Sequence, residues 1–294
     1  MSDVDTFLRE LASWRELPGR SAKSAKSARR EARRLLAKVP PSLEPWRSAM
    51  EATMMEAALF RAEVEATTPL QSKLGGRPYF PKGEPWPTSA DGRALQLLLQ
   101  VNFADVPFLP LFPERGILQL FVDDRRWHDL DESLQVFFHE DVRDASAADF
   151  NDVPVDDFRL RERRLYFELH QEFMTRDDFR FAEALDSTTE ASFAQASRLS
   201  HQLGRDYLRI THHRYVNDPE VGRGRNKLGG YHYSQNEQDP RRDLPGWQDS
   251  LLLVQFQDYE ELSWGDGGSA QFFIKRSDLA ARNFDDLLFH WDST

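Results

Sequence analysis

Four short motifs occur twice in this chain, in the same order and with nearly constant spacing. The two copies of each motif lie 151 to 155 residues apart. The motifs are 73–76 with 227–230, 98–100 with 253–255, 116–122 with 268–274, and 138–141 with 289–292. Ordered recurrence of this kind indicates a structural unit that is used more than once. It predicts two related halves, near residues 70–143 and 224–294.

Each half contains short apolar runs of strand length. Residues 250–275 place two strand candidates on either side of a polar turn at 264–268, and residues 95–123 are a looser version of the same pattern. Alternating apolar side chains at 134–138 add a further strand to the first half. We therefore predict an α+β fold built on an internally duplicated β-rich unit, with two related sheet-containing halves.

The N-terminal part differs in character and predicts a helical extension. Apolar residues recur at helical spacing within 3–14 and 43–66, which indicates two amphipathic helices. Between them, residues 20–38 hold eight basic residues against the single acid Glu31. This segment is a good helix former, and its charge fits either a basic arm for an acidic partner or a solvated helix. The predicted division is a helical extension and an α+β body, 1–68 and 69–294.

The segment between the halves predicts a mixture of strand and helix. Residues 158–169 alternate like a strand, and residues 187–190 have the sequence of a capping box that opens a helix. We expect that helix to stop at Gly204 and the chain to return to strand over 206–216. A basic, glycine-rich loop then follows at 222–230.

The composition limits the compartment and the partners. A formal net charge of −11 argues against nonspecific binding to nucleic acid or anionic lipid, because affinity for such polyanions depends on basic residues. The sequence has no cysteine, which excludes disulfides, thiolate metal sites and cysteine nucleophiles. No apolar run is long enough for a membrane helix, and the first residues lack the features of a secretory signal. We expect a cytoplasmic protein that binds neither nucleic acid nor membrane.

Several of the motifs are similar to those of a known family. The stretches that carry the similarity are 72–79, 85–87, 226–230, 264–268 and 289–292, in this order. Together they resemble the YwqG-like family of bacterial proteins, a domain of unknown function, over roughly residues 70–294. The resemblance implies an α+β fold with internal duplication and no established activity. The resemblance also suggests that some related proteins are encoded near bacterial toxin and immunity systems.

The polar turn at 264–268 is the first candidate site. Trp264, Asp266 and Gly267 would place an aromatic ring and a carboxylate at a loop tip, where binding groups are often found. Asp266-Gly267 is also a strong hairpin signal, so a purely structural turn can explain the glycines as well. The functional interpretation is contact with a ligand or a partner.

The second candidate is the pair of glycine-rich motifs with their basic residues. Arg225 and Lys227 precede one Gly-Gly pair, and Lys73 and Arg77 flank the other. Cations beside exposed backbone amides make a generic site for a small anion. The loop lacks the sequence of a phosphate-binding loop or of a dinucleotide site, so a plain loop is the alternative.

Histidines are the weakest candidates. His139 and His290 each stand two residues before an aspartate, Asp141 and Asp292, so on a strand each pair shares one face. Such a pair can serve as a base or form only a structural contact. The spacing of the histidines matches no metal motif, and we expect no metal and no cofactor.

These patterns favour a non-catalytic binding or interaction module with a cleft between the duplicated halves. One alternative is an enzyme acting on a small anionic substrate, with His290, Asp292 and Asp266 near Arg225 or Lys227. Another is an immunity-type protein that neutralises a basic toxin with its acidic surface. The expected partner is a protein or a small anionic ligand.

Overall fold

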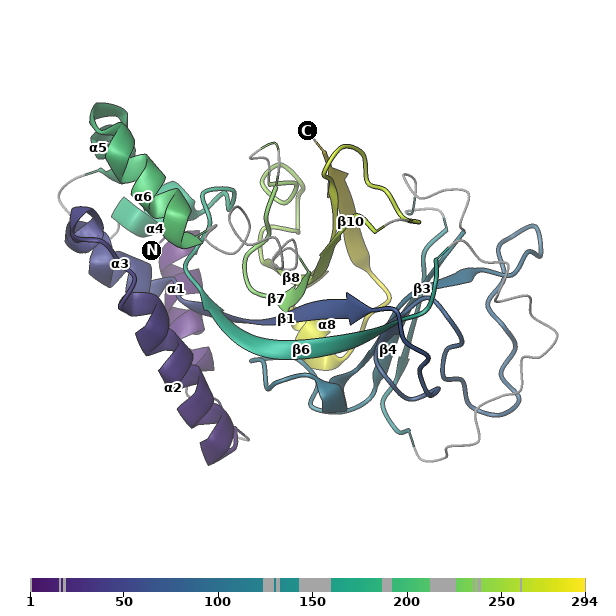
Figure 1. The fold of residues 1–294 in the computed structure, drawn as a ribbon. Helices are drawn as coiled ribbons and strands as arrows, with labels where there is room; N and C mark the ends of the chain where they lie inside the picture. Colours follow the sequence, from purple (N-terminus) through teal and green to yellow (C-terminus); the bar gives the residue numbers. More distant parts are fainter. Residues whose placement is uncertain are drawn as a thin grey trace.

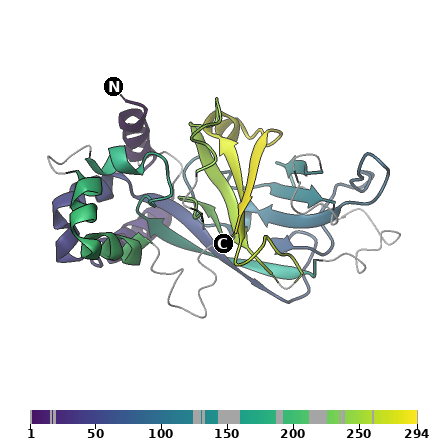
Figure 2. The same cartoon turned by 90° about the horizontal axis from the view of Figure 1, so that it is seen from above.

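The computed structural model describes residues 2–15, 17, 20–123, 130, 133–142, 160–186, 192–211, 226–234, 236, 239–259 and 261–293. Within these residues the chain forms one large, curled antiparallel sheet together with several helices (Figure 1). Most of the helices gather at one end of the molecule, and the strands extend away from them (Figure 2). The mixed helix and strand content agrees with the α+β prediction.

The sheet has ten strands in the order β10-β9-β8-β7-β1-β6-β2-β3-β4-β5. All neighbouring strands in it are antiparallel. The strands are β1 (Met55–Glu63), β2 (Lys73–Leu74), β3 (Gln96–Asn102), β4 (Ile117–Val122), β5 (Gln135–His139), β6 (Arg163–Glu172), β7 (Lys227–Gly229), β8 (Ser250–Gln257), β9 (Ser269–Lys275) and β10 (Leu287–Asp292).

The position of β1 corrects the prediction of one helix over 43–66. The chain forms a 3₁₀ helix, η1 (Pro41–Trp46), and the short helix α3 (Arg47–Ala52), and then enters β1. The first six residues of β1 are all buried, so the strand shows no alternation of apolar and polar side chains. Strands buried on both faces have continuous apolar sequences, which periodicity cannot separate from a buried helix. Part of the predicted helical extension is therefore a central strand.

The strands on the two sides of the β1–β6 pair have matching registers. Lys73 of β2 faces Gln100 of β3 on one side, and Lys227 of β7 faces Gln255 of β8 on the other. The next strand places a second glutamine beside the first in both cases, Gln119 and Gln271. The register shifts once in each of these strand pairs, between Leu97 and Leu99 and between Leu252 and Val254.

The strands predicted within 95–123, at 134–138 and within 250–275 are confirmed. The connection between β8 and β9 differs from the predicted turn. Because β8 ends at Gln257 and β9 begins at Ser269, Asp266-Gly267 is not a two-residue hairpin turn. It lies within the longer loop 258–268, where Tyr259 and Leu262 form an isolated bridge.

Two of the predicted N-terminal helices are confirmed as α1 (Asp3–Trp14) and α2 (Ala22–Leu36). Ser2 and Asp5 exchange hydrogen bonds in a capping box at the start of α1. Ser21 caps α2, because its hydroxyl accepts from the backbone N–H of Ser24 at 3.1 Å. Among the described residues, no helix is both long enough and apolar enough to cross a membrane.

The segment between the halves holds β6, α4 (Phe181–Asp186), α5 (Phe193–Leu199) and α6 (His201–Thr211). β6 overlaps the strand predicted at 158–169. α6 runs through Gly204 and ends at Thr211, so the predicted stop and the following strand are wrong over the described residues. Leu203, Tyr207 and Ile210 are buried at helical spacing and hold the helix in place. The capping box at 187–190 lies outside the described residues.

Two hydrophobic clusters hold helices and sheet together. The larger cluster lines the sheet and takes in Phe7, Leu11 and Trp14 from α1, and Leu279 from α8 (Arg276–Ala281). It also includes Phe103 of the short 3₁₀ helix η2 (Phe103–Asp105). The second cluster joins η1 and α3 with α4, α5 and α6. Only two residues of α2, Ala28 and Leu35, are buried. That helix therefore lies beside the sheet without filling the space next to it.

Candidate functional site

A cavity of about 330 Å³ lies between α1, α2 and the middle of the sheet. This volume is at the lower end of the roughly 300–1,000 Å³ typical of ligand pockets. Its walls come from α1, α2, α3, β1, β6 and β8, from the loop around Leu109 and from the glycines at the end of β7. The cavity therefore joins parts of the chain that are far apart in sequence.

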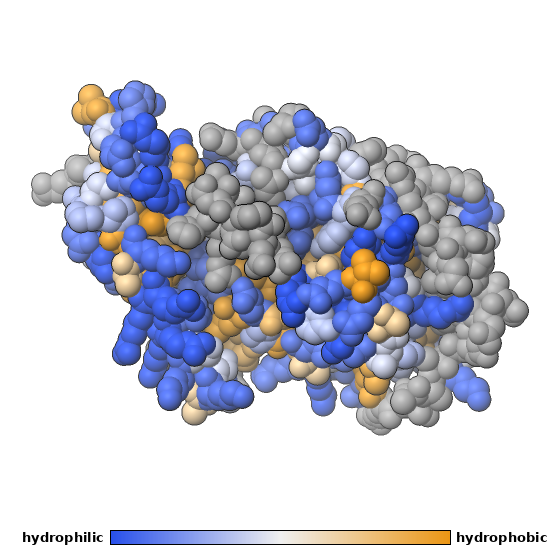
Figure 3. Space-filling model, in the orientation of Figure 1, coloured by the Kyte–Doolittle hydropathy of each residue, from blue (hydrophilic) through white to orange (hydrophobic). Residues whose placement is uncertain are grey.

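Small side chains on α2 leave the space that the cavity occupies. Ala25, Ala28 and Ala32 lie at helical spacing on the face of α2 that lines the cavity. Leu251 and Leu252 of β8 line it from the sheet. Because alanine carries only a methyl group, this face of α2 cannot fill the gap. The outer face of α2 is covered with basic side chains, seen as dark blue at the lower left of Figure 3.

Two glycines of the repeated motif, the last residue of β7 and the residue after it, form part of the wall. Gly229 and Gly230 both have positive φ, +67° and +72°. A Cβ atom on Gly230 would lie 2.5 Å from Oε2 of Glu172, so glycine is required there for close approach as well as for conformation. Glu172 is held in turn by Nζ of Lys227, at 2.9 and 3.0 Å, and by the backbone N–H of Tyr231. The motif at 227–230 thus shapes the cavity.

Three arginines and two glutamates are the charged residues of the lining. Arg20 Nη2 donates to both carboxylate oxygens of Glu56 at 2.6 Å, and both side chains are almost fully buried. Arg15 Nη2 donates to the carbonyl oxygens of Glu51, Ala52 and Met54, and these bonds fix the C-terminal end of α3. Burial lowers the pKa of Arg15. These contacts tie α1 and the residues after it to the start of β1.

The wall of the cavity is mostly apolar outside its charged residues. Apart from the five charged residues, the described lining consists of apolar side chains, two glycines and Gln171. It contains no histidine, serine, threonine, tyrosine, lysine or aspartate among these residues. A hydroxyl or thiol nucleophile paired with a histidine base is therefore not present in the described lining.

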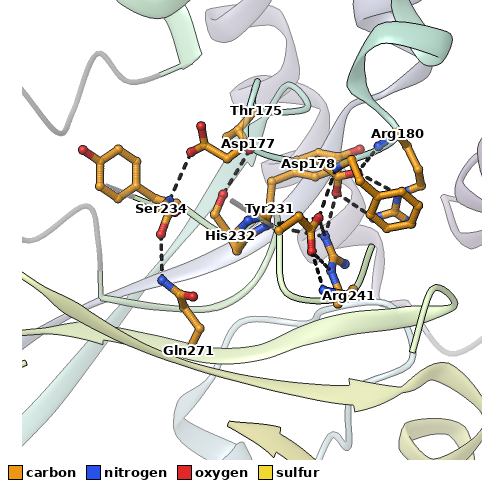
Figure 4. Close-up of polar contacts among 12 residues, drawn as sticks. Thr175, Asp177, Asp178, Arg180, Tyr231, His232, Ser234, Arg241 and Gln271 are labelled. Atoms are coloured by element: carbon orange, nitrogen blue, oxygen red, sulfur yellow. Dashed lines mark hydrogen bonds and ion pairs between the residues drawn. The ribbon is translucent and has the colours of Figure 1, made fainter. Parts of the chain in front are cut away.

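A buried polar network lies elsewhere, where the chain after β6 meets residues 231–241 (Figure 4). Arg241 Nη2 donates to Asp178 at 3.0 Å and to Asp239 at 2.7 Å, and Arg180 Nη2 donates to Asp178 at 2.6 Å. Burial alone would raise the pKa of Asp178, but the guanidinium groups of Arg180 and Arg241 lower it far below its ordinary value. Opposite charges are thus balanced inside the protein.

The same network includes a set of groups with the geometry of metal ligands. One donor atom each from Asp178, His232 and Asp239 lies within 4.8 Å of the others. Both carboxylates already bind arginine, so a metal ion would have to displace Arg241 from them. Burial lowers the pKa of His232, which makes the ring neutral at physiological pH. We interpret the network as an internal ion-pair cluster that joins two segments of the fold.

The residues predicted at the polar turn separate in the structure. Trp264 is fully buried and packs against Phe256 and Phe289, so its ring belongs to the core. Asp266 and Gly267 are exposed in the loop 258–268. None of these three residues lines the cavity between α2 and the sheet.

The predicted anion-binding residues also separate. Lys73 and Lys227 are fully buried, Arg77 is exposed, and Arg225 lies outside the described residues. Lys73 Nζ donates to the carbonyl oxygens of Thr68 and Arg77 at 2.8 and 2.7 Å, and burial lowers its pKa to about 8. Each lysine therefore braces the glycine turn that follows it, Lys227 through Glu172 and Lys73 through carbonyl groups.

The two predicted His–Asp pairs have different surroundings. His139 lies 3.1 Å from Oε1 of Gln119, whereas Asp141 is exposed. Asp292 is buried and accepts from the hydroxyl groups of Ser234 at 2.6 Å and Ser269 at 3.2 Å. Burial lowers the pKa of His139 and of His290.

The cavity residues escaped sequence reasoning because they come from separate elements. Arg20 and Glu56 form an ion pair although they are far apart in the sequence, so no local sequence pattern predicts it. One signal was present in the sequence. Alanines at 25, 28 and 32 recur at helical spacing inside a basic segment, which predicts a helix face that packs without bulky side chains.

Comparison with known proteins gives one result. The family model described as Domain of unknown function (DUF1963) matches residues 72–293, which is most of the chain. The matched region includes all strands of the sheet except β1. None of the curated proteins matches the chain.

Proposed function

Since the chain belongs to this family of unknown function, we propose from its own geometry that it is a non-catalytic binding module. The ligand site is the cavity between α1, α2 and the sheet. The observation that carries this proposal is a space of about 330 Å³ with mostly apolar walls and a few charged groups, the usual make-up of a small-molecule site.

The position of the cavity fits the expected cleft between two halves. Leu109 and Phe112 come from the half near 70–143, and Gly229 and Leu252 come from the half near 224–294. The N-terminal helices close the space from the remaining side. A ligand bound here would contact both halves and the N-terminal segment, and would therefore stabilise their association.

We also infer that the two halves arose by duplication and that the YwqG-like assignment describes the same motifs as the family match. Matching registers and matching register shifts support the duplication. The strand pairing aligns the last motif two residues differently from the sequence. His139 faces Ile117, and Asp292 faces Ser269. Ile117 and Ser269 are 152 residues apart, the same spacing as the motif to which they belong. In this alignment Asp292, not His290, corresponds to His139.

A thermal-shift screen tests the proposed site. Purified protein would be heated with a set of small molecules that includes acids, alcohols, amines, nucleotides and sugars. A ligand at 100 times its Kd stabilises the folded state by about 2.7 kcal/mol, which is roughly 5 °C for a chain of this size. We expect at least one compound to produce such a shift.

Two matched variants locate the binding. Ala28→Phe puts a ring into the cavity from a buried position, and Ala22→Phe makes the same change at an exposed position of α2. The shift should disappear in Ala28→Phe and persist in Ala22→Phe. Equal shifts in both variants, or no stabilising compound for the unaltered protein, would refute the proposal.

A further inference from the structure

A second pocket, of about 300 Å³, lies between β5 and the loop before β3, on the face of β5 that is turned away from the main core. Its walls hold the rings of Phe80, Trp86, Phe137 and His139, three prolines and one acidic side chain, Glu84. None of the residues that line it also lines the cavity between α1, α2 and the sheet. We call it the aromatic pocket and treat it as a separate candidate site.

The tryptophan of the aromatic pocket makes the same kind of contact as an arginine in the other half. Trp86 Nε1 donates to the carbonyl oxygen of Leu95 at 2.8 Å, and Arg241 Nη1 donates to that of Ser250 at 3.0 Å. The two donor residues are 155 residues apart, and so are the two acceptor residues. Each side chain is thus bound to the chain where β3 or β8 begins.

The phenylalanine against which each of these side chains packs also matches. The ring centroids of Trp86 and Phe121 are 5.9 Å apart, and the guanidinium carbon of Arg241 lies 4.9 Å from the ring centroid of Phe273. Phe121 and Phe273 are 152 residues apart and belong to the repeated motif at 116–122 and 268–274. A tryptophan therefore occupies, in the first half, the position that an arginine occupies in the second.

Both halves also carry a carboxylate two residues before this position. In the second half it is Asp239, whose two oxygens accept from Arg241 at 2.9 and 2.7 Å. In the first half it is Glu84, 155 residues earlier, and Trp86 offers it no positive charge. No described residue pairs with the Glu84 carboxylate, and the lining of the aromatic pocket includes no lysine or arginine. The first half thus keeps the acid of the pair without its base.

The acid and part of the aromatic wall are accessible from solvent. Glu84 is exposed, and Phe137 and His139, on one face of β5, are half-buried. Phe80 packs edge-to-face against both rings, with centroids 5.4 Å apart in each case. Burial lowers the pKa of His139, so its ring is neutral near neutral pH. Glu84 is then the only charged group in the described lining of the aromatic pocket.

A lone exposed carboxylate binds a cation weakly, because water competes for both ions. Aromatic rings beside the carboxylate strengthen the attraction, since the face of an aromatic ring carries negative partial charge. We therefore propose that the aromatic pocket binds an organic cation with one positive charge, which pairs with Glu84 and lies against the ring of Phe137.

The size of the aromatic pocket limits the ligand. At about 30 Å³ for each water-sized group, a space of about 300 Å³ holds roughly ten non-hydrogen atoms. This is enough for an ammonium or guanidinium group on a short apolar stem. Such a group can belong to a free small molecule or to a basic side chain of a partner protein. This site goes beyond the proposed function and does not depend on it.

NMR titration of the full chain tests the assignment with matched pairs of ligands. Choline is compared with 3,3-dimethylbutan-1-ol, and N-acetylarginine amide with N-acetylcitrulline amide, so that each cation has a neutral partner of similar shape. At least one cation should bind roughly tenfold more tightly than its neutral partner and shift the indole N–H signal of Trp86. The preferred pair shows whether a small ammonium compound or a basic side chain is the source. Equal affinities, or no binding, in both pairs would overturn the assignment.

A conservative substitution tests the role of Glu84. Glu84→Gln removes the charge and keeps the shape, so the Kd of the cation should rise roughly tenfold while that of the neutral partner stays unchanged. Glu114→Gln is the control, because Glu114 is an exposed acid of the same half that does not line the aromatic pocket. A preference for the cation that survives Glu84→Gln would overturn the assignment.

A further variant separates this site from the proposed function. Ala28→Phe fills the cavity between α1, α2 and the sheet and should leave binding of the cation unchanged. A cation that loses affinity in Ala28→Phe and keeps it in Glu84→Gln would bind in that cavity instead, which would refute the aromatic pocket as its site. Failure of every compound to bind in the cavity would leave the test of the aromatic pocket intact.

Discussion

Gln255 accepts a hydrogen bond from the backbone N–H of Tyr233 at 2.9 Å, six residues after the buried Lys227. Gln100 makes the same bond to Tyr79 at 2.8 Å, six residues after the buried Lys73. In both places a glutamine inside an apolar strand holds the chain that leaves the Gly-Gly turn. In each case the glutamine side chain reaches from its strand to a backbone N–H that lies outside the sheet.

The two glutamines should therefore have similar effects on stability. Replacing Gln100 or Gln255 by Leu leaves a buried N–H without its acceptor, and each change should lower the free energy of unfolding by about 1–3 kcal/mol. Urea denaturation measures the effect, with Gln195→Leu at an exposed position of α5 as the control. A loss in one half and none in the other would contradict the equivalence of the two turns.

Arg241 should be essential for stability. Replacing it by Ala leaves Asp239 buried without its main counter-charge and leaves Asp178 with Arg180 alone, and removal of one partner from a buried ion pair costs about 3–5 kcal/mol. The neighbouring Arg242 is exposed, and its replacement by Ala should change stability by less than about 0.5 kcal/mol. Chemical denaturation of both variants compares them. Similar stabilities would show that the network contributes little.

Two glycines should respond to alanine in opposite directions. A Cβ on Gly268 would lie 2.7 Å from the carbonyl oxygen of Asp292, and closer still to that of Trp264, so Gly268→Ala should destabilise the sheet edge. Gly204 lies inside α6 with nothing near its Cβ position, so Gly204→Ala should stabilise the protein by about 1 kcal/mol through helix propensity. Thermal melts measure both changes. Destabilisation by Gly204→Ala would argue against α6 as described.

Stability should fall as the pH drops below the ordinary pKa of histidine. Burial lowers the pKa of His232, whose ring lies near Asp178, Asp239, Arg241 and Phe273. The unfolded chain takes up a proton near pH 6.5, while folded His232 stays neutral to a lower pH. The free energy of unfolding therefore decreases between these two values, by up to about 1.4 kcal/mol per pH unit for this group.

An NMR titration of the ring and urea denaturation across pH measure this effect. His232→Gln should show a shallower loss of stability below pH 6.5 than the unaltered protein. A ring resonance of His232 that titrates above pH 6.5 would contradict the prediction, because it would mean that the carboxylates outweigh burial.

The elements that sequence predicted well have local causes. The apolar runs at 95–102 and 250–257 became β3 and β8, since each combines strand length with flanking turn residues. α1 and α2 followed from helical spacing and from alanine-rich composition. For these elements the residues next to each other in sequence contain most of the information.

The errors come from residues whose environment is set by distant parts of the chain. Met55 to Phe60 continue the helical spacing of Trp46 and Met50, and only the partner strands β6 and β7 make them a strand. Trp264 stands among glycines as a loop-tip residue would, yet Phe256 and Phe289 enclose its ring. The cavity was beyond prediction for the same reason, because its wall combines α1, α2 and both halves of the sheet.

The central place of β1 affects how the protein is made. During synthesis β1 leaves the ribosome before both of its flanking strands, since β6 begins at Arg163 and β7 at Lys227. At translation rates of about 5–20 residues per second, β1 waits roughly 5–20 s for β6 and longer for β7. Until more than half of the chain has emerged, the mostly apolar segment from Met55 to Phe60 lacks the strands that cover it in the native sheet. The nascent chain therefore exposes an apolar segment of the kind that chaperones bind.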